Sequence, residues 1–180
     1  MNQQPRFCSP LRSAGDFSSK PKQIRLLVTR EALSRCFFAA ARREFEQVVK
    51  LNQSDAAAYF NLANVCTVTN QLPDARHFLE EGLRRQPESG FGKFLLGSID
   101  LREGRLQEAE TALREAIQLS PTMTQARLQL VNLLLQGNRK QDAIAQLRDF
   151  ISTFPADPFA PRATQLLQKL DPSAQSPVKK

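Results

Sequence analysis

The sequence predicts an all-α protein, folded as a right-handed α-solenoid of stacked antiparallel helix pairs. Three observations lead to this prediction: a composition that favours helix, a repeat with a period of about 34 residues, and two helical patterns within each repeat. Only seven glycines occur in 180 residues, and a sheet-rich fold would need more of them for its turns. The abundant Ala, Leu, Gln, Arg and Glu residues form helices readily.

The repeat is visible in four columns of residues that recur at the same spacing. A fixed period of this kind indicates helical units that stack on one another. One unit cannot bury its apolar face alone, so neighbouring units must share a continuous core. The columns, all with the same step from one member to the next, are Pro87, Pro121 and Pro155; Ala75, Ala109 and Ala143; Leu62, Leu96 and Leu130; and Leu79, Leu113 and Leu147.

Within each unit the sequence predicts two helices joined by a tight turn. Gly104 interrupts the apolar pattern of the middle unit, at a place where a helix end favours a residue that tolerates left-handed dihedral angles. Asn70 and Asn138 occupy the equivalent places in the neighbouring units, and Asn is the next best residue there. The small residues Ala63 and Gly97 of the first helices are expected to face the Ala column of the second helices, so that the paired helices can approach closely.

These columns resemble the tetratricopeptide repeat (TPR) family. The match is closest in residues 56–89 and 90–123, and residues 124–157 form a third copy. Tyr59 lies where the family favours an aromatic residue, whereas Arg127 replaces that residue in the third copy. The resemblance implies three TPR units, whose first helices line a concave face.

The two ends of the chain fit the repeat less well. Residues 22–55 are expected to form a degenerate repeat or a capping helix pair, in which Arg35–Phe38 replaces the usual turn residues with bulky ones. Residues 158–170 carry one apolar stripe and predict a helix that caps the array. The basic segment 1–21 is expected to be disordered, and residues 171–180 to form a flexible tail.

The net charge of +7 is mostly a property of the N-terminal part of the chain. The first 50 residues hold ten Lys and Arg against four Asp and Glu, and the middle of the chain is mildly acidic. A nucleic-acid-binding repeat would show a basic stripe along its folded part, so we do not expect nucleic acid as the partner. That alternative predicts binding that weakens steeply with salt and depends on the basic N-terminal segment.

Neither a metal site nor a catalytic site is expected. Cys8, Cys36 and Cys66 are far apart and odd in number, which predicts no disulfide framework and no zinc site. His77, the only histidine, has no nucleophile or carboxylate beside it in the pattern, so neither an enzyme nor a cofactor is expected. The N-terminal residues lack an apolar signal sequence, and no apolar run is long enough to span a bilayer. We therefore expect a cytoplasmic protein.

The resemblance also implies which residues face a partner in the concave groove. Apolar residues there would take up side chains of the partner, and amides would bind its backbone. A second interpretation of Phe60, Phe94 and Leu128 is packing between adjacent first helices. The implied partner-binding residues are Asn64, Phe60, Phe91, Phe94, Ser98, Leu101, Gln125, Leu128 and Asn132.

The function that these features predict is a non-catalytic protein–protein interaction module or assembly adaptor. Some members of the family grip a C-terminal carboxylate with basic residues. Because Phe60, Gln125 and Gln129 fill the corresponding places, a chaperone tail is not the expected ligand. The alternative is a structural spacer or a self-associating subunit, in which Phe37 and Phe38 near the N-terminal end form an interface.

Overall fold

The protein is an array of helix pairs that follow one another along a curved path. The structure, a computed structural model, describes residues 22–172 and the side chains of residues 36–172. Within these residues it contains eight α helices and no strand, which confirms the predicted fold class. Segments 1–21 and 173–180, for which disorder and a flexible tail are expected, lie outside the described residues.

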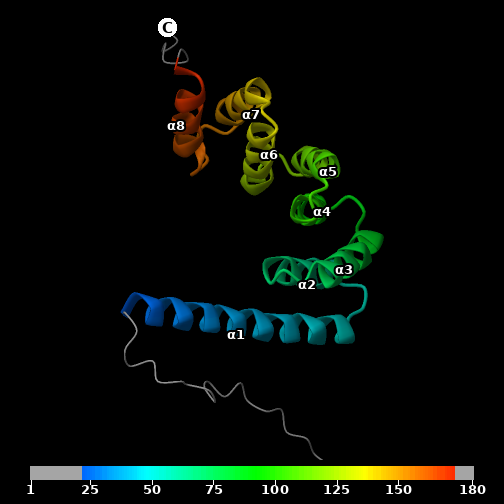
Figure 1. The fold of residues 1–180 in the computed structure, drawn as a ribbon. Coiled ribbons are helices and arrows are strands. Elements are labelled where there is room, and N and C mark those ends of the chain that lie inside the picture. Colours follow the sequence, from blue (N-terminus) through cyan, green and yellow to red (C-terminus); the bar gives the residue numbers. More distant parts are fainter. Residues whose placement is uncertain (1–21, 173–180) are drawn as a thin grey trace, which may run out of the picture.

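Three helix pairs stand between a long N-terminal helix and a short C-terminal one. The array forms an arc, in which α2 and α4 lie on the inner side and α3 and α5 on the outer side (Figure 1). The helices are α1 (Lys22–Leu51), α2 (Ala56–Val68), α3 (Leu72–Arg85), α4 (Gly90–Arg102), α5 (Leu106–Leu119), α6 (Thr124–Gln136), α7 (Lys140–Thr153) and α8 (Ala160–Leu170).

The turn inside each pair has the conformation that the sequence predicts. Asn70, Gly104 and Asn138 have positive φ angles of 61°, 78° and 57°. The next residue donates its backbone N–H to the carbonyl oxygen five residues back, which completes a Schellman motif. These hydrogen bonds are Gln71 to Cys66 at 2.8 Å, Arg105 to Asp100 at 2.9 Å and Arg139 to Leu134 at 2.8 Å.

The core follows the predicted columns. Every residue of the Ala column is fully buried, and the second-helix Leu column is at most 2% exposed. Gly97 lies so close to α5 that an added Cβ would stand 2.8 Å from Cγ of Leu113. Val131 takes the equivalent place in the third pair, where the backbones of α6 and α7 approach each other less closely than those of α4 and α5 do. A small residue at this place therefore lets the two helices approach closely.

The helix pair predicted for residues 22–55 is wrong. The segment contains one helix instead, because α1 runs without interruption from Lys22 to Leu51. Arg35–Phe38 holds no Gly, Asn or Pro, so nothing stops the helix at the place where the other units turn. The C-terminal part of α1 packs against α2, as the second helix of a preceding unit would.

At the other end α8 covers the last pair. It lies within residues 158–170, for which a capping helix is expected, and packs against α7. Ala163 is buried, whereas Arg162, Gln165, Gln168 and Lys169 are exposed. The outer face of α8 is therefore polar, as the last element of a solenoid requires. In the part of the chain that the structure describes, no helix is both long and apolar enough to cross a bilayer.

Candidate partner-binding surface

The nine residues implied for the groove lie on the first helices of the three pairs, but they differ in exposure. Asn64 of α2, and Gln125 and Asn132 of α6, are exposed polar residues. Phe91, Phe94, Leu101 and Leu128 are half-buried, and the two remaining residues, Phe60 and Ser98, are buried.

Phe60 belongs to the core and not to an open groove. Its side chain is 3% exposed and fills a space that two glycines leave free. A Cβ added at Gly82 would stand 2.6 Å from Cε1 of this ring, and one added at Gly92 would stand 2.9 Å from the same atom. The prediction that Phe60 contacts a partner is therefore wrong, and its alternative interpretation as a packing residue holds. In the sequence, Gly82 and Gly92 were the residues that could have indicated a buried Phe60 ring, because they leave room for it.

Phe91 and Phe94 form an aromatic pair on α4 beside that core. Their ring centroids are 6.2 Å apart and the rings are stacked, while Phe91 also meets Phe60 edge-on at 6.3 Å. Such arrangements are favourable for aromatic rings and hold them in place. The pair is half-buried, so it presents part of its apolar surface to solvent.

Ser98 is buried and links two units. Its hydroxyl lies 2.9 Å from the carbonyl oxygen of Phe94 and 2.9 Å from Oε1 of Gln129. The first contact is within α4 and the second reaches α6. A hydroxyl has one O–H, so the Ser98 donor is shared between these two oxygens inside the protein, and a role of Ser98 toward a partner stays a prediction.

A hollow of about 310 Å³ lies between α4 and α6. It combines three leucines with three amides and one guanidinium group, so it can hold an apolar side chain and bind polar backbone groups beside it. Two of the implied groove residues, Leu101 and Asn132, are in its wall. The lining residues are Leu101, Arg102, Leu106, Gln129, Asn132, Leu133 and Gln136.

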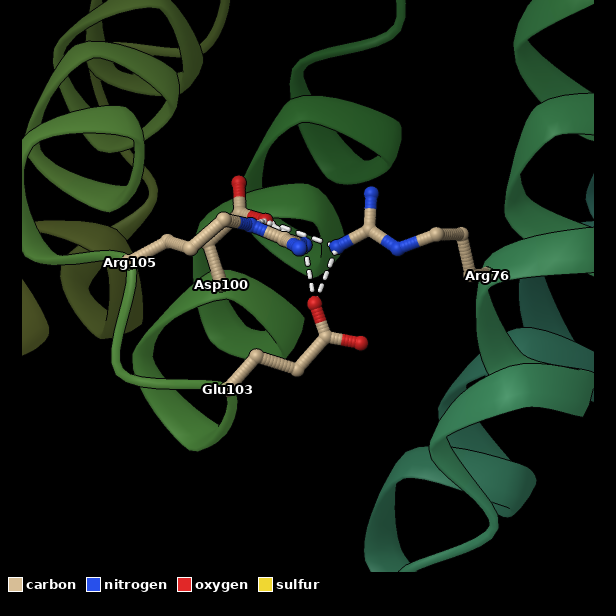
Figure 2. Close-up of polar contacts among 4 residues, drawn as sticks. All are labelled: Arg76, Asp100, Glu103 and Arg105. Carbon is tan, nitrogen blue, oxygen red and sulfur yellow. Dashed lines mark hydrogen bonds and ion pairs between the residues drawn. The ribbon is translucent and has the colours of Figure 1, made fainter.

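A cluster of four charged residues joins the first pair to the second (Figure 2). Nη2 of Arg76, from α3, lies 2.7 Å from Oδ1 of Asp100 and 2.7 Å from Oε2 of Glu103. Nη2 of Arg105 lies 2.6 Å from the same Asp100 oxygen and also contacts Glu103. The Asp100 side chain is only 5% exposed. Burial raises the pKa of Asp100 above its ordinary value, although the charge of Arg76 opposes this.

The same place carries an ion pair at the other two junctions. Nη2 of Arg42, in α1, lies 3.0 Å from Oδ2 of Asp74, and Oε2 of Glu110, in α5, lies 2.7 Å from Nη1 of Arg139. Arg42, Arg76 and Glu110 are one period of the repeat apart, so they are equivalent positions. The cluster around Asp100 is therefore one of a series of links between units. Sequence reasoning missed it, because Arg76 belongs to a different unit from Asp100 and Glu103, the two residues that it meets.

The described residues offer no group of three or more His, Cys, Asp or Glu side chains that could hold a metal ion. His77 is exposed on α3, and its ring centroid lies 5.5 Å from that of its neighbour Phe78. Cys66 of α2 is buried, and burial raises the pKa of its thiol.

Two protein-family models match the chain over the repeated units. A family model described as tetratricopeptide repeat matches residues 38–90 and 100–170, and a second model of that description matches residues 69–126. The first model thus begins inside α1, after the segment with the weakest repeat pattern. No curated protein matches the chain.

Several solved structures share the fold. The crystal structure of MamA matches with 21% identity and a TM-score of 0.62, over 80% of this chain and 82% of that one. TTC0263, a thermophilic TPR protein of Thermus thermophilus, matches with 22% identity and a TM-score of 0.59, over 84% and 80%. The first TPR of Spaghetti (RPAP3), bound to an HSP90 peptide, matches with 16% identity and a TM-score of 0.55, over 67% and 96%.

Proposed function

The chain belongs to the tetratricopeptide repeat family, and on this premise we propose that it is a non-catalytic adaptor that holds a segment of a partner protein against α4 and α6. The observation that carries the proposal is the hollow between these two helices. Its mixture of leucines and amides suits an extended or helical peptide better than a small charged metabolite.

The exposed and half-buried first-helix residues extend this hollow into a longer surface. Phe91 and Phe94 lie on α4 with Leu101, and Gln125 and Leu128 lie on α6 with Asn132. Asn64 of α2 is exposed next to this row of first helices, one turn before the exposed Val68. Apolar pockets on alternate turns would select side chains, while the amides would bind the peptide backbone.

The partner is a protein segment held mainly by its side chains and backbone. Spaghetti is bound to an HSP90 peptide, but this chain has Gln125 and Gln129 where a carboxylate-binding TPR domain needs basic groups. Arg102 supplies a positive charge at one side of the hollow. We place the binding in the cytoplasm, where the buried thiol of Cys66 stays reduced.

The test compares a hollow variant with a matched variant of the outer side. Leu101→Arg with Asn132→Ala changes the hollow, and Leu119→Arg with Gln118→Ala makes the same chemical changes at exposed places on α5. Partners captured from a lysate of the source cells are identified by mass spectrometry. The binding segment of each is then located with overlapping peptides, and its dissociation constant is measured by fluorescence anisotropy.

We expect the hollow variant to lose the partner, with a dissociation constant raised on the order of 100-fold, because central apolar anchors dominate such interfaces. The α5 variant should bind as the wild type does. Equal binding by the wild type and the hollow variant, at wild-type helicity, would remove the function from this surface.

A further inference from the structure

The outward side of α1 carries an apolar stripe that nothing in the described residues covers. Phe37 is 68% exposed, Val48 39% and Leu51 87%. Together with Ala41 and the exposed Glu44, the one charged residue in the row, these residues form the α1 stripe, spaced by four and three residues in turn. Alternation of this kind places side chains in one line along a helix and is the spacing by which two helices pack.

The repeat shows what two members of the stripe, Ala41 and Val48, would contact in a complete unit. Ala41 and Val48 occupy the places that Ala75 and Gly82 take one period later, in the next unit. There both residues are buried, and the first helix of the same unit covers them. The places one and two repeats further on are buried as well, by Ala109 with Ala116, and by Ala143 with Phe150.

Among residues 22–172 no helix covers α1 at that place. The α1 stripe lies beside the residues that α2 covers, of which Phe45 and Val49 are half-buried. The register assigns the role of first helix to residues 22–34, but α1 is one straight helix (Figure 1), so these residues continue along its axis and do not fold back over the stripe.

We propose that the α1 stripe is the contact surface of a homodimer, in which α1 of a second copy packs against it in the antiparallel direction. The first helix of a unit always runs antiparallel to the second, so the missing helix must have this direction. Residues 22–34 of the second copy have the register of a first helix, and the arrangement covers both stripes at once. Such a two-fold contact closes on itself.

The rest of the chain favours this partner over a head-to-tail neighbour. Stacking of one copy's α1 on another copy's α8 would place the stripe against Arg162, Gln165 and Lys169, which are exposed and polar. In the antiparallel pairing of two α1 helices, each stripe instead faces residues 22–34 of the other copy, which have the register of a first helix. The register places Val28 of one copy at the level of Ala41 and Phe45 of the other, so the two-fold axis passes near Cys36. The proposal does not depend on the function of the α4–α6 hollow.

Sedimentation equilibrium of the full chain over a range of concentrations tests the dimer. The wild type should reach about twice the monomer mass of 20.2 kDa. Phe37→Glu with Val48→Glu should raise the dimer dissociation constant on the order of 100-fold, because each copy then buries two charges in an apolar contact. Leu119→Glu is the control, since it places the same charge on an exposed leucine of α5. A wild type that stays monomeric, or a dimer that survives the double substitution, would overturn the proposal.

A thiol cross-link tests the direction of the helices and leaves the α1 stripe intact, so it also decides the matter if the double variant fails to fold. Cys36 is exposed, and Cys8→Ser removes the other N-terminal thiol. With a bis-maleimide, Cys36 should give a covalent dimer. Lys50→Cys in a Cys36→Ser background should not, because the two copies of residue 50 lie about 40 Å apart in the antiparallel pairing. The reverse result, or no cross-link at either place, would exclude this pairing.

Discussion

Asp100 and Arg76 stand in different units, yet the carboxylate of the first lies 2.7 Å from the guanidinium nitrogen of the second. Asp100 is also bound by Arg105, so a nearly buried anion sits between two cations (Figure 2). A buried charge is tolerated when it is paired and becomes costly when one partner is removed. The junction between the first and second pairs therefore depends on this group being complete.

Replacing Asp100 by Ala should lower the free energy of unfolding by about 2 kcal/mol, because Arg76 and Arg105 lose a nearly buried hydrogen-bonding anion and keep only Glu103. Asp100→Asn keeps an acceptor oxygen and should cost about 1 kcal/mol. Urea unfolding followed by circular dichroism measures both. Glu103→Ala is the comparison, since its more exposed side chain should contribute less. A cost for Asp100→Ala below that of Glu103→Ala would mean that the cluster does not hold the junction.

Glu110 should make the protein less stable in acid. Burial raises the pKa of this carboxyl, but hydrogen bonds from Arg114 and Arg139 outweigh burial and bring the pKa below its ordinary value. The folded carboxyl then binds fewer protons than the unfolded one. Its contribution is present above the unfolded-state pKa and is lost as the pH falls through the folded-state pKa. Between about pH 6 and about pH 3, the wild type should therefore lose more stability than Glu110→Gln does.

The contribution of Asp100 to stability should change with pH in the opposite direction to that of Glu110. Its pKa is raised by burial, so the folded carboxyl binds more protons than the unfolded one. Its contribution is greatest below the unfolded-state pKa and declines as the pH rises through the folded-state pKa. The stability difference between wild type and Asp100→Asn should thus move with pH in the direction opposite to that for Glu110→Gln. Parallel pH dependences for the two variants would contradict one of the two assignments, and the sign of the shared change would show which one.

Gly82→Ala should destabilise the protein, although Ala is normally the better helix residue. The new Cβ would stand 2.6 Å from the buried ring of Phe60, and overpacking of this kind should cost about 1 to 2 kcal/mol. The cost should shrink when Phe60 is replaced by Leu in the same chain, which a double-mutant cycle of thermal unfolding measures. Gly137→Ala, whose nearest neighbour would be 3.5 Å away, should be close to neutral. Equal costs for the two glycines would argue against a clash with the ring.

Gly104→Ala should be costly for a different reason. An added Cβ meets no atom within 4 Å there, but the residue has a φ of 78°. The left-handed conformation costs a residue with a side chain about 1 kcal/mol. Asn138→Gly, at the equivalent turn, should therefore leave stability unchanged or raise it slightly. Thermal unfolding of the two variants checks the expectation, and a loss in both would show that side chains, not backbone angles, determine the turn.

The sequence predicts the parts of this fold that depend on local rules. Gly104 and Asn138 identify the helix ends because few residues adopt positive φ, and the repeated columns identify the core because each unit buries the same places. The shape of α1 escapes prediction because a degenerate repeat still fits its register. Only the lack of a stop residue in Arg35–Phe38 separates one helix from two.

The binding surface is predicted less completely than the fold. Phe60 and Phe94 share a column, but only Phe60 is fully buried, since Gly82 and Gly92 leave room for it. Burial thus depends on residues of other helices and not on the column itself. Gln129 was absent from the implied set for the same reason: its place in the wall of the hollow depends on how α4 and α6 meet.

The links between units also restrict the order in which the units can follow one another. A deletion of residues 90–123 removes one full period and would be expected to leave a shorter array of the same kind. It would, however, bring Arg76 to the place of Glu110, where its neighbour is Arg139. Two guanidinium groups would then meet at a site built for an ion pair. Units of equal length are therefore not interchangeable here. In the shortened chain, Arg76→Glu would be needed to restore an ion pair with Arg139 where the first pair meets the third.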